Sequence, residues 1–440
     1  MINIKNLNSK ILNKEAKVGV IGLGYVGLPL ALLISNKGFK TYGFDIDDKK
    51  IKSLKEKKSY ISHIPSEKIK ESLNFYPTGD FSKLKICDIV IICVPTPTTE
   101  TNEPDLSAVV STSEVVKKYL HKGEVVILVS TTYPTTTRDV VKPILEKSGL
   151  KCGKDFFLAF SPEREDPGNK VYSTENIPKL VGGVDRISTE VVCLFFSQIV
   201  NKVIPVSSAE VAEASKVLEN TFRAVNIALV NELKMLFDRM GIDIWEVIDA
   251  ASTKPFGFMT FYPGPGWGGH CIPVDPFYLS YIAKKYDFST KFIELAGQIN
   301  IRMPEFVVEK VSEALNQRKK VLNGAKILVL GLSYKKDIGD LRESPSLRVI
   351  ELLEKKGSKV DYNDPYIEQI PPLRKYKFLK RSVELNEKNL KRYDCVIIIT
   401  DHSCYDYKMI LENSNLIVDT RNAIRRNLPN YKNLQKVVQA

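Results

Sequence analysis

The sequence is poor in the features that mark several protein classes. Histidine occurs only 4 times in 440 residues, and neither His270 nor the pair His402 and Cys404 has the spacing of a metal-ligand motif. No apolar run approaches the ~18 residues that a membrane-spanning helix requires. Residues 1–17 are polar and dotted with lysine, without the apolar core of a secretory signal. We therefore expect no metal, no membrane segment and no export signal.

Cysteine usage and net charge indicate the cellular compartment and the kind of partner. The 7 cysteines are scattered without a CxxC pair, and their odd number would leave one unpaired in any complete disulfide scheme. This pattern favours reduced thiols in the cytoplasm. The net charge is +12, but the lysines are dispersed and are not interleaved with aromatic residues. Nucleic acid is therefore a poor candidate partner, and an anionic small substrate accounts for the charge equally well.

Apolar strands alternate with helical segments over the first part of the chain. The strands are continuous apolar runs at residues 17–22, 41–45, 88–94, 124–129 and 154–161. Such strands, separated by helices, are typical of a parallel sheet that is covered on both faces. The pattern predicts one doubly wound domain of the Rossmann type.

A long helical segment follows this domain. Residues 209–240 have helical periodicity, contain no proline and stop at Gly241. A helix of this length spans about 45 Å and commonly bridges domains or packs against a partner subunit. Helical patterns continue to residue 302, and a strand-turn-helix pattern restarts at 326–331. We predict an α/β protein with a Rossmann domain (1–205), a central helical domain with a long connecting helix (206–315) and a Rossmann-like α/β domain (316–440).

A glycine-rich turn follows the first strand. Gly22, Gly24 and Gly27 form a GxGxxG motif between a strand and a helix, and Asp45 ends the next strand. In a Rossmann fold the first glycine makes the tight turn, the second admits the pyrophosphate and the third allows close helix packing. The acid accepts hydrogen bonds from a ribose diol and would repel a 2′-phosphate. The motif predicts an NAD site, with FAD as the main alternative.

Two further loops follow strands at their carboxyl ends. They are VPTPT at 94–98 and STTYP at 130–134. Ligands of open parallel sheets bind at this edge. The loops are either generic proline-threonine turns or a source of hydroxyl and amide groups for cofactor and substrate.

The glycine-dense segment 264–275 is the most informative stretch of the chain. It delivers Cys271, with Asp275 four residues further on. If a helix begins near Cys271, the two side chains share one face, and the helix N-terminus lowers the pKa of the thiol. A covalent nucleophile is presented in this way. A structural loop with a buried thiol fits the same residues equally well.

Polar groups on other elements would complete such a centre. Lys216 and Asn220, with Glu213 nearby, share one face of the long helix. They form either a solvated polar face or a group that polarises an alcohol oxygen and positions a water. Glu163 ends a strand as either a general base or the structural partner of Arg164.

Several motifs together resemble a known family. They are GLGYVG (22–27), VPTPT (94–98), STTYP (130–134), SPER (161–164), GGHCIPVD (268–275), YKKDIGDLRES (334–344) and VDTRN (418–422). In this combination the chain resembles the UDP-glucose/GDP-mannose dehydrogenases along essentially its full length. The segments SPEREDPGN (161–169) and PFGFMTFYPGPGWGGHCIP (255–273) are most similar to the bacterial UDP-N-acetylglucosamine 6-dehydrogenases.

The resemblance implies two successive hydride transfers to two NAD, which convert a C6 hydroxymethyl group to a carboxylate. Cys271 would capture the intermediate aldehyde as a thiohemiacetal, and the second oxidation would give a thioester that water hydrolyses. Lys216 would stabilise the developing alkoxide. The remaining implied catalytic residues, which orient water and move protons, are Asp275, Asn220, Glu163 and Thr132.

The resemblance also implies two sets of binding residues. The cofactor neighbours are Gly22, Gly24, Tyr25, Val26, Gly27, Asp45, Lys50, Val94, Pro95, Thr96, Pro97, Thr131 and Arg342. The substrate neighbours are Tyr262, Gly264, Gly266, Gly268, Lys335 and Arg421. Lys335 and Arg421 suit the role of diphosphate clamps, although ordinary surface charge is the alternative.

The chain departs from the family pattern in two places. Pro167 stands where many relatives carry a second glutamate, so Glu165 or Asp166 is the candidate replacement. Residues 252–262 contain no equivalent of the arginine that some UDP-glucose enzymes supply from the partner subunit. This second departure disfavours UDP-glucose.

The resemblance therefore implies an NAD-dependent 6-dehydrogenase of a UDP-N-acetylhexosamine, first UDP-N-acetylglucosamine, that feeds surface polysaccharide synthesis. The long helix and the resemblance together predict a dimer or higher homo-oligomer. UDP-glucose, UDP-N-acetylmannosamine and UDP-N-acetylgalactosamine are alternative substrates. Two other classes stay open. One is a two-electron β-hydroxyacid dehydrogenase, which needs no thiol, and the other is a non-catalytic nucleotide-sugar sensor.

Overall fold

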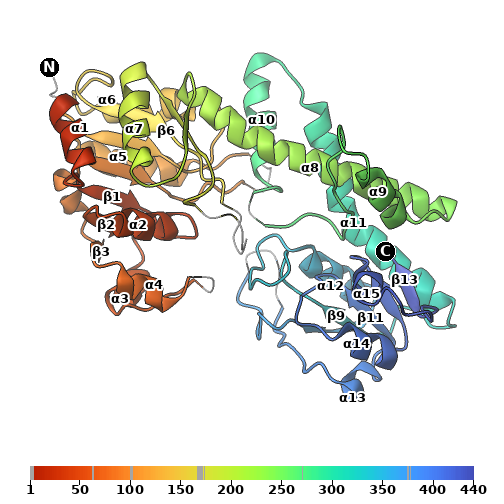
Figure 1. The fold of residues 1–440 in the computed structure, drawn as a ribbon. Helices are drawn as coiled ribbons and strands as arrows, with labels where there is room; N and C mark the ends of the chain where they lie inside the picture. The colour runs from red at the N-terminus through yellow and green to blue at the C-terminus, as the bar shows by residue number, and fades with distance from the viewer. Residues whose placement is uncertain are drawn as a thin grey trace. The chain divides into compact units, whose positions relative to one another are not determined.

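The structure, a computed structural model, describes residues 4–61, 64–99, 103–165, 172, 174–269, 271–373, 376 and 378–440. It divides into two units: the first is Met1–Glu219 with Val274–Ser289, and the second is Asn220–Pro273 with Thr290–Ala440. Figure 1 shows the order of the elements along the chain. Within the described ranges, no helix has the length and apolar character needed to cross a bilayer.

An eight-stranded sheet forms the first unit, in the order β3-β2-β1-β4-β5-β6-β7-β8. Its strands are β1 Val18–Ile21, β2 Thr41–Phe44, β3 Phe75–Thr78, β4 Ile89–Ile92, β5 Val125–Leu128, β6 Phe157–Phe160, β7 Lys179–Gly183 and β8 Val203–Pro205. The strands from β3 to β6 are parallel, whereas β7 runs antiparallel to β6. This confirms the predicted parallel Rossmann sheet and adds an antiparallel step that no sequence pattern indicated.

Both faces of this sheet are covered. The α-helices of residues 1–205 are α1 Ile4–Leu12, α2 Gly27–Asn36, α3 Asp48–Lys55, α4 Ser66–Glu71, α5 Ser107–Tyr119, α6 Lys142–Glu146 and α7 Arg186–Ser197. In β4, Ile89 and Ile91 face the core under α1, α2 and α7, while Val90 and Ile92 face the core under α5 and α6. Successive side chains of a strand point to opposite faces, so continuous apolar strands are what a doubly covered sheet requires.

Further α-helices lie between the two α/β parts along the chain. They are α8 Ala209–Met240, α9 Ile244–Ser252, α10 Asp275–Ala283 and α11 Lys291–Asn316. The bounds of α8 are those that the sequence predicts. α11 continues through Pro304, past the expected end of the pattern, because Val307 and Val311 in its second half are buried in the core of the second unit.

The expectation that a helix begins near Cys271 is wrong. α10 begins at Asp275, and Pro276 occupies its first turn. Proline favours this position because its missing N–H would be unbonded there in any case. Cys271 therefore lies in the turn that precedes the helix, not at the helix N-terminus.

A five-stranded parallel sheet organises the second unit, in the order β10-β9-β11-β12-β13. Its elements are β9 Lys326–Leu330, α12 Pro345–Lys355, β10 Lys359–Asn363, α13 Glu387–Leu390, β11 Cys395–Ile398, α14 Tyr407–Asn413, β12 Ile417–Asp419, α15 Ala423–Asn427 and β13 Val437–Gln439. The predicted Rossmann-like architecture is confirmed, whereas the domain boundaries after residues 205 and 315 stay predictions.

Candidate active site

The glycine turn after β1 brings backbone segments into close contact. Gly22 has a φ of +92°, and a Cβ there would lie 2.5 Å from the carbonyl oxygen of Cys93. A Cβ on Gly27 would lie 1.8 Å from the carbonyl oxygen of Gly22, so α2 starts against the turn. At Gly24, no atom of the described residues lies within 4 Å of the Cβ position. Packing explains the glycines at 22 and 27 but not the one at 24, so the turn leaves space for a pyrophosphate beside Gly24.

Asp45 closes the same turn from the end of β2. Its carboxylate accepts hydrogen bonds from the N–H groups of Leu23 and Asp47, each at 2.9 Å, and from Lys50 Nζ at 3.1 Å. The structure therefore brings Asp45, Lys50 and the turn together. Tyr60 also joins this cluster, because its hydroxyl donates to the carbonyl oxygen of Leu23. Nothing in the sequence marks Tyr60 as a member.

The loops at the carboxyl ends of β4 and β5 are tied to each other. The Ser130 hydroxyl donates to the Val94 carbonyl oxygen at 2.7 Å, and the Thr96 hydroxyl donates to the Thr131 carbonyl oxygen at 2.6 Å. The hydroxyl of Tyr278, from α10, donates to the carbonyl oxygen of Thr96. The predicted cofactor neighbours on these loops thus form one connected polar surface.

Thr132 differs from its neighbours on this surface. It is 0% exposed, and its hydroxyl has no hydrogen-bond partner among the described residues. A buried hydroxyl without a partner costs about 1–3 kcal/mol. An orphaned donor of this kind fits the predicted role of Thr132 in holding a water, which stays a prediction.

Glu213 on α8 anchors the end of the same loop. Its carboxylate accepts hydrogen bonds from Thr135 N–H at 2.6 Å and from the N–H and hydroxyl of Thr137 at 2.8 and 2.6 Å. Thr135 has a φ of +86°, which is strained for a β-branched residue. Burial raises the pKa of Glu213 to about 7, although the hydrogen bonds from Thr137 and Thr135 act in the opposite direction. Glu213 therefore holds a strained turn beside Thr132 against the long helix.

The predicted catalytic residues of α8 and α10 are buried. Lys216, Asn220 and Asp275 are 8%, 3% and 3% exposed, so the alternative of a solvated polar face is wrong. Cys271 is half-buried and is not in a disulfide. Lys216 and Asp275 belong to the first unit, with Thr132, whereas Asn220 and Cys271 belong to the second. Their assembly into one centre stays a prediction.

Glu163 lies just beyond the end of β6 in an ion pair that was not expected. It accepts hydrogen bonds from Lys179 Nζ at 2.8 Å and from the N–H groups of Arg164 and Glu165 at 2.8 and 2.9 Å. The alternative of an Arg164 partner is wrong, because the Arg164 guanidinium pairs with Glu219 at 2.6 Å. Burial alone would raise the pKa of Glu163, but Lys179 and the hydrogen bonds hold it below its ordinary value. Glu163 is therefore ionised and a weak proton acceptor.

Glu165 has the opposite electrostatics. Burial raises its pKa, and the nearby carboxylate of Glu163 adds to this effect, while a hydrogen bond from the Thr174 hydroxyl at 2.8 Å opposes it. The other candidate base, Asp166, and the departure at Pro167 lie outside the described residues. Of the two glutamates that the structure describes here, Glu165 is the stronger base.

In the second unit, the glycine loop at 264–269 packs directly on the C-terminal sheet. A Cβ on Gly264 would lie 2.5 Å from Nη1 of Arg421. A Cβ on Gly268 would lie 2.5 Å from the Cβ of Tyr334, and Gly269 N–H donates to the Arg342 carbonyl oxygen at 2.9 Å. The loop that leads to Cys271 is therefore seated on the segments that carry the predicted substrate residues.

The predicted substrate residues are held in different ways. Arg421 follows β12, and its Nε donates to the Ile399 carbonyl oxygen at 2.9 Å. Tyr262 stacks on Trp245 with 5.4 Å between ring centroids, and its hydroxyl donates to Asp249 at 2.6 Å. Lys335 lies in the loop after β9 and is partly exposed. The roles of these residues toward a ligand stay predictions.

Arg342, the predicted cofactor neighbour of the second unit, pairs with Asp340 at 2.6 Å. His402 is buried, with Nε2 at 3.1 Å from the Asp364 carboxylate and Nδ1 accepting from Asp337 N–H at 2.9 Å. His270 lies outside the described residues. In the part of the chain that the structure describes, no group of three His, Cys, Asp or Glu side chains is placed to hold a metal ion.

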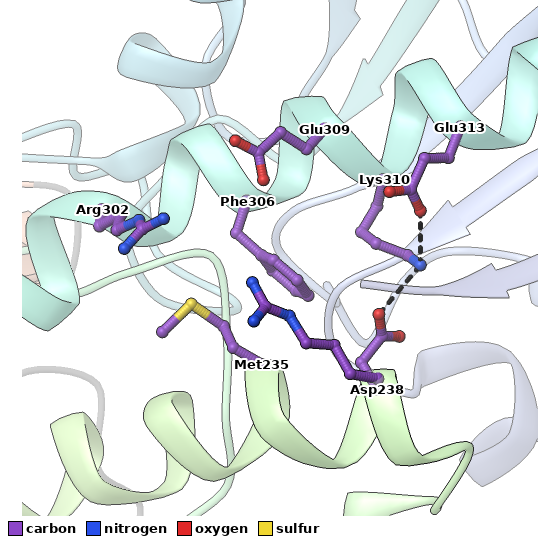
Figure 2. Close-up of a pocket in the computed structure, with 8 residues that line it drawn as sticks. Met235, Asp238, Arg302, Phe306, Glu309, Lys310 and Glu313 are labelled. Carbon is purple, nitrogen blue, oxygen red and sulfur yellow. Dashed lines mark hydrogen bonds and ion pairs between the residues drawn. The ribbon is translucent and has the colours of Figure 1, made fainter.

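Two cavities lie along α11. One of about 130 Å³ is lined by Gly266, Trp267, Pro304 and Pro345, beside the glycine loop. The other, of about 110 Å³, lies between α8 and α11 (Figure 2). In Figure 2 the Lys310 ammonium bridges Asp238 and Glu313, at 3.0 and 2.9 Å. None of the predicted site residues lines this second cavity.

A Rossmann turn with room at Gly24, together with the acid at the end of its second strand, defines the class of dinucleotide-binding proteins. The sequence matches the family models of the UDP-glucose/GDP-mannose dehydrogenase family for the NAD binding domain (residues 16–200), the central domain (210–302) and the UDP binding domain (328–426). The chain belongs to this family and is an NAD-dependent dehydrogenase.

Individual relatives cover nearly the whole chain. Protein CapL of Staphylococcus aureus is 38% identical over 92% of this chain and 96% of its own. A UDP-N-acetyl-D-glucosamine 6-dehydrogenase of Pseudomonas aeruginosa is 37% identical over 89% of this chain and 91% of its own. The solved structure of a UDP-D-ManNAc dehydrogenase from Pyrococcus horikoshii is 31% identical, with a TM-score of 0.85 and coverage of 96% and 98%. Relatives with 31–37% identity to this chain are thus named for different UDP-sugars.

Proposed function

We propose that this enzyme oxidises the C6 hydroxymethyl group of UDP-N-acetylglucosamine to a carboxylate, with two NAD consumed per sugar. The main observation behind the proposal is the contact of the glycine loop with the predicted substrate residues. Gly264 lies against the guanidinium of Arg421, and the same loop leads to Cys271. Arg421 and Lys335 then hold the diphosphate, while the loop presents the thiol that the second oxidation requires.

The residues of the chain divide the chemistry between them. NAD, when bound, accepts the hydride in each oxidation. Lys216 stabilises negative charge on the sugar oxygen. The Cys271 thiolate adds to the aldehyde carbon and forms a C–S bond, which is retained through the second oxidation as a thioester. Water then breaks this bond, releases the carboxylate and regenerates the thiolate.

Proton transfer and water binding fall to the remaining residues. Thr132, Asn220 and Asp275 orient the hydrolytic water, since Thr132 presents a buried hydroxyl without a partner among the described residues. We assign the proton acceptor of hydrolysis to Glu165, whose pKa is raised. Glu163, held by Lys179, keeps Arg164 and Glu165 in place through their N–H groups.

UDP-N-acetylmannosamine is the second candidate substrate, because the P. horikoshii structure carries that name at 31% identity. A panel of UDP-sugars, followed at the NADH absorbance, decides between them. The proposal expects the highest kcat/KM with UDP-N-acetylglucosamine and two NADH per sugar. A higher value with the mannosamine, glucose or galactosamine substrate would replace the assigned sugar. A yield of one NADH would indicate a two-electron enzyme instead.

We also propose a homodimer that works in the cytoplasm and supplies an acidic sugar for surface polysaccharide. On α8, Phe222, Leu229, Leu236 and Met240 are 47%, 50%, 49% and 58% exposed and recur at helical spacing. A helix that exposes such an apolar stripe normally buries it against another surface. Light scattering should give at least twice the chain mass, and a particle of 49.6 kDa would contradict the dimer. All seven cysteines are free thiols, the state that a reducing compartment maintains.

A further inference from the structure

Two buried asparagines link the long helices of the second unit to the glycine loop. Asn231 on α8 and Asn300 on α11 are 0% and 1% exposed. Gly264 N–H donates to Asn231 Oδ1 at 2.9 Å, and Asn231 Nδ2 donates to Asn300 Oδ1 at 2.7 Å. Asn300 Nδ2 donates in turn to the Ala296 carbonyl oxygen at 2.9 Å. The chain of hydrogen bonds thus runs from the loop to the backbone of α11.

This chain has only one consistent direction. The carbonyl oxygen of Ala296 can only accept, so the amide nitrogen of Asn300 must face it, and its oxygen must face Asn231. The oxygen of Asn231 is then left to face the loop, where it meets the N–H of Gly264. A buried network with every polar group bonded is rigid and specifies one arrangement.

The backbone of Asn300 adds a second contact to the loop. Pro304, one turn later on α11, has no N–H, so the Asn300 carbonyl oxygen receives no helical hydrogen bond from it. A Cβ on Gly266 would lie 3.0 Å from this oxygen, and Gly266 has a φ of +118°. The missing helical hydrogen bond at Pro304 and the absence of a side chain at Gly266 together let the loop lie on α11.

We propose that Asn231 and Asn300 are positioning residues, which fix the glycine loop against Arg421 and thereby set the place of Cys271. The inference deepens the proposed function and rests on it for the roles of Arg421 and Cys271. A loop N–H that is bonded to a buried side chain cannot drift without leaving both partners unbonded. A misplacement of about 1 Å at a reacting group can lower a rate on the order of 100-fold.

The test compares Asn231→Ala and Asn300→Ala with the control Asn415→Ala. The amide of Asn415 donates to the carbonyl oxygens of Tyr393 and Lys391, at 2.8 and 3.2 Å, on the amino side of β12. The control loses hydrogen bonds in the same unit but touches no part of the loop. Hydrogen exchange of peptides from 260–273, UDP affinity by calorimetry and steady-state kinetics are measured for each variant.

The proposal expects faster exchange of the loop in both asparagine variants, with UDP affinity lower by about tenfold and kcat/KM lower on the order of 100-fold. Asn415→Ala should match the wild type in all three. Asn231→Asp keeps the acceptor for Gly264 N–H but sets an oxygen against Asn300 Oδ1. The variant should therefore be less stable than Asn231→Ala, while its loop stays better protected and its UDP affinity is higher. A purely stabilising role predicts the reverse order, because the aspartate buries a charge.

Two results would overturn the inference. One is unchanged exchange of the loop in Asn231→Ala and Asn300→Ala, and the other is affinity losses that follow only the melting temperature across all variants. Failure of the proposed function is separable, since it would appear as a wild-type enzyme without turnover of any UDP-sugar. The exchange measurement needs no substrate and decides the positioning role in that case as well.

Discussion

Glu213 provides a quantitative test of how the loop after β5 is held. It is fully buried on α8, and burial raises the pKa of its carboxyl from 4.5 to about 7. Between these two values the folded protein keeps a proton that the unfolded chain has released. Stability therefore falls as the pH rises through this window. The difference between the two pKa values corresponds to roughly 3 kcal/mol of unfolding free energy.

The perturbation is Glu213→Gln, which removes the titration but keeps the size of the side chain. Urea unfolding of both proteins at pH 5, 6, 7 and 8 gives the difference in unfolding free energy at each pH. We expect the wild type to lose roughly 2.5 kcal/mol relative to the variant between pH 5 and pH 8, because part of the window lies below pH 5. A pH-independent difference would refute the reasoning. A difference that grows in favour of the wild type would mean that the hydrogen bonds from Thr135 and Thr137 outweigh burial.

Three further predictions concern the chemistry. Cys271→Ser should fold normally, but its rate of carboxylate formation should fall by several orders of magnitude, because a serine hydroxyl is a much weaker nucleophile. NADH yield and product analysis measure this rate. An undiminished rate would exclude the thioester. Gly264→Ala places a Cβ 2.5 Å from Arg421, and such overpacking costs about 1–3 kcal/mol. Calorimetry should therefore show UDP binding that is weaker by about tenfold. An unchanged UDP affinity would mean that Arg421 does not belong to the site. Glu165→Gln should lower kcat by about 10²–10⁴-fold while a first burst of NADH persists in stopped flow; loss of the burst would place Glu165 before hydrolysis.

Much of the fold is readable from the sequence, because strong local patterns agree with the tertiary structure. α8 has its predicted bounds, since no proline interrupts it and Gly241, with a φ of +69°, ends it. The sequence patterns do not predict β3, β7, β8 and β13. β8 and β13 have only three residues each, and β3 and β7 contain proline or glycine, which weakens a strand pattern. α11 passes through Pro304 because burial of its second half outweighs one lost hydrogen bond.

The candidate site is readable only where the chemistry depends on glycine, cysteine or a spacing. Gly22 and Gly264 are required by close contacts that the motifs reflect. Glu213 and Asn231 are polar residues on an amphipathic helix, where the pattern indicates a solvated face, and only tertiary packing shows that they are buried. The pairing of Glu163 with Lys179 joins the loop after β6 to the first residue of β7, and the sequence does not predict the antiparallel contact of these two strands.

The central claim is that Cys271 carries the half-oxidised sugar as a covalent adduct. Mass spectrometry of the enzyme, acid-quenched during turnover of UDP-N-acetylglucosamine with NAD, tests this claim most directly. The account predicts an added sugar-nucleotide acyl mass on the peptide that contains Cys271, and more of it in Glu165→Gln, where hydrolysis is slowed. An unmodified Cys271 throughout turnover, with the carboxylate still formed, would contradict it.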